Sequence, residues 1–142
     1  MNLEKIQDLW RKDSAIDNDL LCEESTKIPQ LHMKYMELFN TFILMKKDLE
    51  AKMKVIRKEK WLYYKGKAGA EKYKEMPFDL KLTSREEIDM FIDADSDYQK
   101  ALLKLDYIDQ TVAFLDSVLR QLNNRTYQIK NAIEWQKFQN GL

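Results

Sequence analysis

Residues 98–139 read YQKALLKLDYIDQTVAFLDSVLRQLNNRTYQIKNAIEWQKFQ and contain neither glycine nor proline. Apolar side chains recur there in alternating steps of three and four residues, which is the spacing of a coiled-coil seam. The pattern predicts one long amphipathic helix that carries this C-terminal seam. Its members are Leu105, Ile108, Val112, Leu115, Leu119, Leu122, Ile129 and Ile133, with Thr126 in the remaining position.

A second seam runs through the first half of the chain. Pro29 fits the first turn of a helix, and apolar residues then recur with the same spacing from Leu31 to Tyr63. Two glycines and a proline within residues 65–79 indicate a loop after this helix. The sequence therefore predicts two long helices separated by that loop.

Two shorter helices are expected as well. Residues 3–12 have amphipathic spacing and lead into a polar, Asp-rich turn that extends to about Asp19. Further along, Thr83 and Ser84 are followed three residues later by glutamates, which is the spacing of a capping box. A helix should therefore begin near Arg85.

The composition limits the fold class to helices. The chain has 142 residues, 44% of them hydrophobic, but only 3 glycines and 2 prolines, too few for the turns of a β protein. We expect one all-α domain over residues 1–142, with an N-terminal part at 1–79 and a C-terminal part at 80–142.

A helix of about 40 residues is roughly 60 Å long, whereas a compact chain of this size has a radius of gyration of about 14–15 Å. The long helices are therefore expected to assemble as a homo-oligomeric helical bundle, and the alternative is an antiparallel hairpin that buries both seams within a monomer.

The N-terminus is charged and lacks the apolar core of a signal peptide, so we expect a cytoplasmic protein. No apolar run approaches the roughly 18–20 residues of a membrane span, and no membrane partner is expected. Cys22 is the only cysteine, which suits a reducing compartment.

Catalytic and metal-binding patterns are missing from the sequence. His32 is the only histidine, so a histidine-based metal site or catalytic triad cannot form. Asp93, Asp95 and Asp97 have the spacing that opens a calcium loop, but the glycine and the final glutamate of that loop are absent. We expect no metal, no cofactor and no enzymatic activity, and we interpret the aspartates as a capping or turn cluster.

The 24 basic and 24 acidic residues cancel in total but are unevenly distributed. Residues 46–74 contain eleven basic and four acidic residues, a net charge of +7, and residues 75–119 contain four basic and eleven acidic ones, a net charge of −7.

Most of the basic residues between 47 and 65 project from the helix side opposite the seam, together with Trp61. A rigid cationic stripe with aromatic side chains suits single-stranded nucleic acid, because cations contact phosphates and rings stack on unpaired bases. The candidate DNA-binding residues are Lys54, Arg57, Lys58, Lys60, Trp61, Tyr64, Lys65 and Lys67, of which Lys60 lies closest to the apolar side.

Two other readings of this segment remain open. Its lysines could pair with the acidic residues of 86–97, within or between subunits, in a coiled-coil scaffold that has no DNA role. The basic helix could also attach to a membrane surface.

The run KVIRKEKWLYYKGKAG, residues 54–69, resembles the basic helix of the UvsY-type recombination mediators of T-even-like bacteriophages. In that family a Lys-x-Arg pair precedes a Leu-x-Tyr-Tyr-x-Gly run. The long helix near the C-terminus is also similar to the family in placement and character. The N-terminus agrees with the family's opening at Leu3, Glu4, Lys12, Asp13, Ile16, Asp17 and Leu20.

The resemblance implies a homo-oligomer, a hexamer or heptamer, in the cytoplasm of an infected bacterium. It would bind single-stranded DNA and load a RecA-like recombinase onto strands coated with single-strand-binding protein. The family's two DNA-contacting positions correspond to Lys58 and Lys60, and at the second the family's arginine is a lysine, which lacks the planar guanidinium fork. Trp61 replaces a family leucine. Self-association would fall on the C-terminal seam, and the acidic residues 86–97 are a candidate docking surface for a basic partner or simply a solvated helix start.

Overall fold

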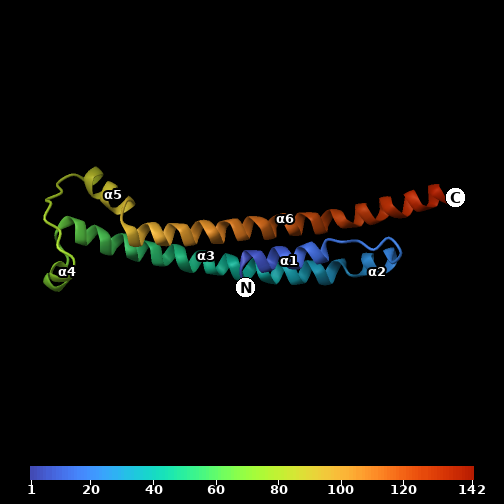
Figure 1. Cartoon of the computed structure of the whole chain (residues 1–142), viewed down its shortest axis with the longest axis horizontal. Coiled ribbons are helices and arrows are strands. Elements are labelled where there is room, and N and C mark those ends of the chain that lie inside the picture. The colour runs from blue at the N-terminus through green and yellow to red at the C-terminus, as the bar shows by residue number, and fades with distance from the viewer. The chain divides into compact units, whose positions relative to one another are not determined.

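The computed structural model describes all residues from 1 to 142 and contains six helices and no strand (Figure 1). The all-α prediction is therefore confirmed, and both long helices lie close to their predicted positions. The helices are α1 (Leu3–Asp13), α2 (Leu21–Thr26), α3 (Ile28–Lys65), α4 (Ala70–Glu75), α5 (Arg85–Asp93) and α6 (Ser96–Gln139).

Side-chain caps and a glycine set the helix ends. The Asn2 side chain accepts a hydrogen bond from a first-turn amide of α1, and the Ser84 hydroxyl does the same for α5. Gly66, at φ +85°, ends α3 in a conformation that other residues rarely adopt. Asp95 caps α6, because its carboxylate accepts hydrogen bonds from the amides of Asp97 and Tyr98 at 2.9 and 3.1 Å. Within the aspartate cluster, Asp95 is thus a cap, as the sequence predicted, whereas Asp93 and Asp97 pair with Arg57 and Lys60.

Two short helices, α2 and α4, were not predicted. Each has only six residues, and neither begins with a side-chain hydrogen bond to a first-turn amide. α4 lies inside the predicted loop 65–79. Fewer than two turns of helix give no detectable apolar repeat, which is why the sequence carries no signal for them.

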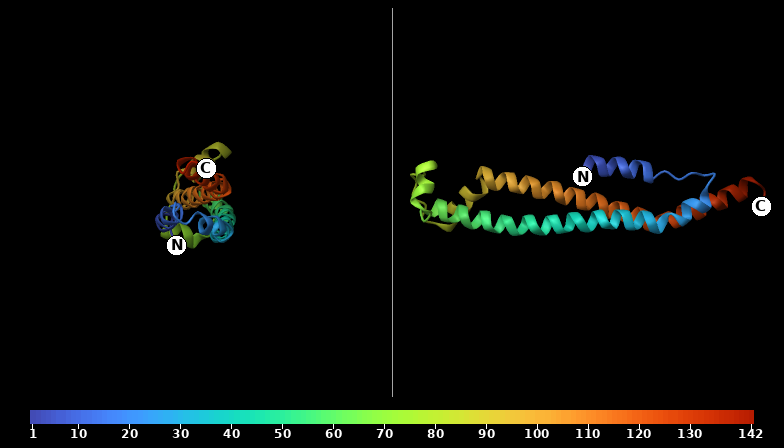
Figure 2. Two further views of the ribbon diagram at one scale, coloured as in Figure 1. Left: turned by 90° about the vertical axis from the view of Figure 1, so that its right-hand side faces the viewer. Right: turned by 90° about the horizontal axis from the view of Figure 1, so that it is seen from below.

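The chain forms two compact units, and each contains part of α3 and part of α6. Unit 1 comprises Met1–Ile43 and Gln110–Leu142, and unit 2 comprises Leu44–Asp109. In each unit, α3 and α6 segments lie side by side and antiparallel (Figures 1 and 2). Residues from the two halves of the sequence therefore share each core.

In unit 1, α1 lies along the first part of α3 (Figure 2). The Trp10 ring contacts the Tyr35 ring edge-on, with 5.4 Å between ring centroids. The Tyr35 hydroxyl donates to the Asp13 carboxylate at 2.8 Å, and Lys34 pairs with the same carboxylate at 2.6 Å. Arg125 of α6 donates to the backbone carbonyls of Asp13 and Ala15, at 2.8 and 3.1 Å. These contacts fix the N-terminal segment on the core.

In unit 2, an aromatic cluster joins the end of α3 to the segments that follow it. Its rings belong to Tyr63, Tyr64, Tyr73, Phe78 and Phe91, with neighbouring centroids 5.0–5.6 Å apart. The Tyr73 hydroxyl donates to the Tyr63 carbonyl at 2.7 Å and accepts from a loop amide at 3.2 Å. The cluster therefore holds the connection after α3 in place.

The C-terminal seam, which the sequence analysis assigned to self-association, is mostly buried within a single chain. Five of its members are buried: Ile108, Leu115, Leu119, Leu122 and Ile129. Leu105 and Val112 are half-buried, Ile133 is 37% exposed, and Thr126 is exposed as well. The antiparallel pairing of α3 and α6 segments in each unit covers this face, so the five buried side chains cannot also form an open surface for a second copy. No helix combines the length and the apolar character that a membrane span requires.

Candidate nucleic-acid interface

The second half of α3 carries a row of cations that form no ion pair. Its members, here called the open basic face, are Lys47, Lys54, Lys58 and Lys65, with Trp61 in the same row. Lys47, Lys54 and Lys58 are exposed and Lys65 is half-buried. From Lys47 to Lys65 the row extends over eighteen helical steps, or about 27 Å at 1.5 Å per residue, along the part of α3 that belongs to unit 2. Such spacing allows several phosphates of one strand to be contacted at once.

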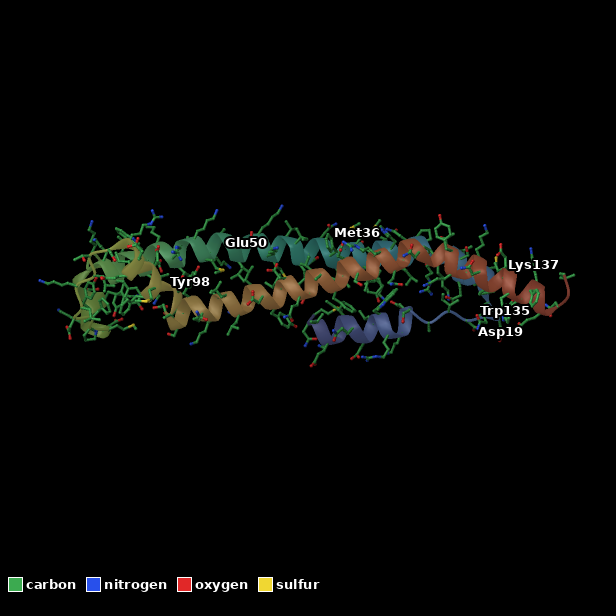
Figure 3. The ribbon with its side chains drawn as sticks, turned by 90° about the horizontal axis from the view of Figure 1, so that it is seen from above. Asp19, Met36, Glu50, Tyr98, Trp135 and Lys137 are labelled. Atoms are coloured by element: carbon green, nitrogen blue, oxygen red, sulfur yellow. The ribbon has the colours of Figure 1, made fainter.

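Arg57 faces the acidic elements of its own unit. Its guanidinium pairs with Asp89 at 3.0 Å and with Asp93 at 3.7 Å. It also lies 5.8 Å from the ring centroid of Tyr98, at the start of α6 (Figure 3). Burial opposes the charged form, but the contacts with Tyr98 and the two aspartates outweigh it and raise the pKa of Arg57. This arginine therefore links α3 to α5 and α6.

Lys60 is enclosed by carboxylates instead of facing solvent. Its Nζ lies 2.8 Å from Asp97 and 3.3 Å from Asp95, and its side chain is only 9% exposed. Burial alone would lower the pKa of Lys60, but the two carboxylates outweigh burial and raise it. Tyr64 donates to Asp95 at 2.6 Å and packs in the aromatic cluster. The structure thus gives Lys60, Tyr64 and Arg57 partners within unit 2.

Trp61 lies in the row of the open basic face and also lines a cleft. The indole is half-buried, and Nζ of the exposed Lys67 lies 5.7 Å from its ring centroid. The cleft has a volume of about 500 Å³ and is bounded by α3 and by the start of α5. Its lining includes Arg57, Trp61, Lys65, Arg85, Ile88 and Asp89.

Arg85 is the one lining cation that the sequence did not predict as a site residue. It is separated from Trp61 by more than twenty positions, and only the fold brings α5 back to α3. The capping box places Arg85 at the start of a helix, but it carries no information on which surface that helix adjoins. Elsewhere in the chain, no three His, Cys, Asp or Glu side chains are grouped so that they could hold a metal ion.

Large apolar side chains are exposed near the C-terminal end of α6. Trp135, which lies near the C-terminal end of α6 (Figure 3), is 59% exposed, and its ring stacks on that of Phe138, with centroids 5.6 Å apart. Phe138 is 73% exposed and Tyr127 is 67% exposed. The stacked pair of Trp135 and Phe138 is here called the C-terminal apolar cluster of unit 1.

These observations describe an all-helical protein with a rigid, open cationic face, which is the kind of surface that binds polyanions. The comparison with known proteins identifies the family to which this helical protein belongs. The model of the family described as "Recombination, repair and ssDNA binding protein UvsY" matches residues 9–142, and this chain belongs to that family.

Similar proteins support the same assignment. Recombination protein uvsY of Enterobacteria phage T4 is 25% identical over 141 residues, which are 99% of each chain. A crystal structure of the bacteriophage T4 recombination mediator protein UvsY matches with a TM-score of 0.85 at 25% identity, over 97% of this chain and 99% of that one. A second crystal form matches with a TM-score of 0.85 at 24% identity and shows the shared fold. The family resemblance predicted from residues 54–69 and the N-terminus is confirmed.

Proposed function

We propose that this protein is a recombination mediator that binds single-stranded DNA through the open basic face of α3. The observation that carries the proposal is the row of lysines without carboxylate partners beside an accessible indole. Such lysines can neutralise phosphates and release the counterions condensed on the nucleic acid without first breaking an ion pair of their own. Membership of the UvsY family supports DNA as the polyanion.

The two family contact positions take different roles in this proposal. Lys58 is exposed and unpaired, so it contacts the DNA backbone directly. Lys60 would have to leave Asp95 and Asp97 to do so. We assign Lys60, Arg57 and Tyr64 to holding α5 and α6 against α3, and Lys54, Lys58, Trp61, Lys65 and Lys67 to contact with the strand.

The protein acts as a homo-oligomer in this proposal, in the cytoplasm of the infected bacterium. Several copies of a modest contact surface on one particle bind a strand far more tightly than one copy does. The C-terminal apolar cluster, not the buried seam, is the surface we assign to self-association, because exposed aromatic patches are characteristic of interfaces. In this proposal the mediator role consists of loading a RecA-like recombinase onto strands coated with single-strand-binding protein. The T4 relative, whose structure is described as that of a recombination mediator protein, supports a mediator role.

The salt dependence of binding to a fluorescent oligothymidylate tests the proposal. The double variant Lys54→Ala/Lys58→Ala should bind more weakly, and the slope of log K against log salt should fall by about 0.7 for each lost phosphate contact. The variant Lys100→Ala/Lys104→Ala is the matched control, because these lysines are also exposed and four residues apart, on α6 of the same unit. It should leave both affinity and slope unchanged.

Two outcomes would contradict the proposal. If both double variants reduce the slope equally, the protein binds DNA through its general charge and not through α3. If the wild-type protein shows no binding at physiological salt, while Lys60→Ala alters its oligomeric mass, the basic and acidic segments serve a scaffold with no DNA role.

A further inference from the structure

The cleft beside Trp61 is lined by the indole and by three cations, which differ in how strongly each is paired with a carboxylate. Arg57 is held by Asp89 at 3.0 Å, so its charge is largely balanced within the cleft. Lys65 forms no ion pair. The Arg85 Nε lies 4.0 Å from the Asp89 Oδ2, which makes this a long ion pair, and the Arg85 side chain is 91% exposed. The cleft therefore retains a net charge of +2 from three cations and one carboxylate, with Lys65 and Arg85 able to accept an anion.

This cleft is continuous with the open basic face. Lys58, Trp61 and Lys65 follow one another in steps of three and four residues, so they lie on one side of α3. A strand whose phosphates follow the lysines therefore passes the mouth of the cleft. The volume of about 500 Å³ lies within the range of small-molecule sites, so the cleft is large enough for one nucleotide unit.

We propose that the cleft is a nucleotide subsite in which one unpaired base stacks on the Trp61 indole while Lys65 and Arg85 contact its phosphate. The inference rests on the proposed function and specifies how one part of the strand is held. Stacking needs a base that is not already paired, so the subsite favours single-stranded over double-stranded DNA. Every base has a π face, so the subsite recognises an unpaired base without reading its sequence.

The first test compares an oligothymidylate with a strand of equal length that consists entirely of abasic sites. The two strands carry the same phosphates, so only a stacking site distinguishes them. Trp61→Ala should weaken binding of the oligothymidylate by roughly 5- to 150-fold and leave binding of the abasic strand unchanged. Trp61→Phe keeps a stacking ring and should restore most of the affinity. Circular dichroism and the thermal midpoint check that each variant folds.

The second test concerns the phosphate contact. Arg85→Gln should reduce the salt slope by about 0.7. Arg120→Gln is the control, because that arginine is 78% exposed, belongs to unit 1 and removes the same charge.

The results separate failure of the subsite from failure of the proposed function. Equal loss of affinity for intact and abasic strands in Trp61→Ala would overturn stacking, and so would equal affinity of Trp61→Ala and wild type for the intact strand. An unchanged slope in Arg85→Gln would remove that arginine from the site. If Lys54→Ala/Lys58→Ala still weakens binding in any of these cases, the open basic face remains the DNA surface and only the cleft is excluded.

Discussion

Removal of the Lys60 side chain should destabilise the fold without removing a DNA contact. In Lys60→Ala the Asp95 carboxylate, whose side chain is 7% exposed, loses its cation. Breaking a buried pair by removing one partner typically costs about 3–5 kcal/mol. Asp95 keeps the Tyr64 hydroxyl and two backbone amides, so we expect a value near the lower end, about 3 kcal/mol.

Urea unfolding followed by circular dichroism at 222 nm measures this loss, at one fixed protein concentration because association contributes to stability. Lys58→Ala is the matched control, since it removes an exposed, unpaired lysine from the same helix and should change stability by less than about 0.5 kcal/mol. For the DNA slope we expect the reverse order: a decrease in Lys58→Ala and none in Lys60→Ala once both are folded. A Lys60→Ala variant that is as stable as wild type and has a reduced salt slope would refute this division of roles.

Three further outcomes follow from the structure. Arg125→Ala should lower stability by about 3 kcal/mol in urea unfolding, because the buried Glu24 loses its 2.9 Å partner and keeps only the longer pair with Lys27 at 3.5 Å. Equal stability would contradict this. For both Asp13 and Asp95, burial raises the pKa, but their hydrogen bonds and nearby cations outweigh burial and lower it below the ordinary value near 3.9. In acid the native state therefore binds fewer protons than the unfolded state. The stabilisation is present above about pH 4 and is lost as the pH falls through the native pKa values. The thermal midpoint, measured between pH 2 and 6, should fall with pH in the wild type and fall less steeply in Asp95→Asn. Trp135→Ser/Phe138→Ser should lower the mass seen by sedimentation velocity while the helical spectrum is kept, and an unchanged mass would place self-association elsewhere.

The long helices were predictable because their apolar repeat continues for many turns. The starts of α1 and α5 coincide with local capping residues, Asn2 and Ser84, that act within one turn. The repeat identifies the face of α6 that is buried but does not say against what it is buried. The same repeat is compatible with burial against another subunit or within one chain, and the fold buries most of the C-terminal seam within one chain.

The sequence predicted which residues lie near the candidate site, but not which of them are exposed and which are paired with carboxylates. Helical geometry alone places Lys54, Lys58 and Trp61 on one side of α3 and Lys60 nearer the apolar side. The carboxylates that enclose Lys60 lie more than thirty residues further along the chain, so no local pattern links them to it. Arg85 was missed for the same reason, since its place beside Trp61 depends on how α5 returns to α3.

The central claim is that the exposed lysines of α3 contact DNA while Lys60 remains enclosed. Brief acetylation with a water-soluble reagent, with and without an oligothymidylate, followed by peptide mass spectrometry, measures both properties at each lysine. We expect Lys54 and Lys58 to react readily in the free protein and to be protected by DNA, and Lys60 to be unreactive in both states. A Lys60 that reacts in the free protein and is protected by DNA, or a Lys58 whose reactivity DNA leaves unchanged, would contradict this claim.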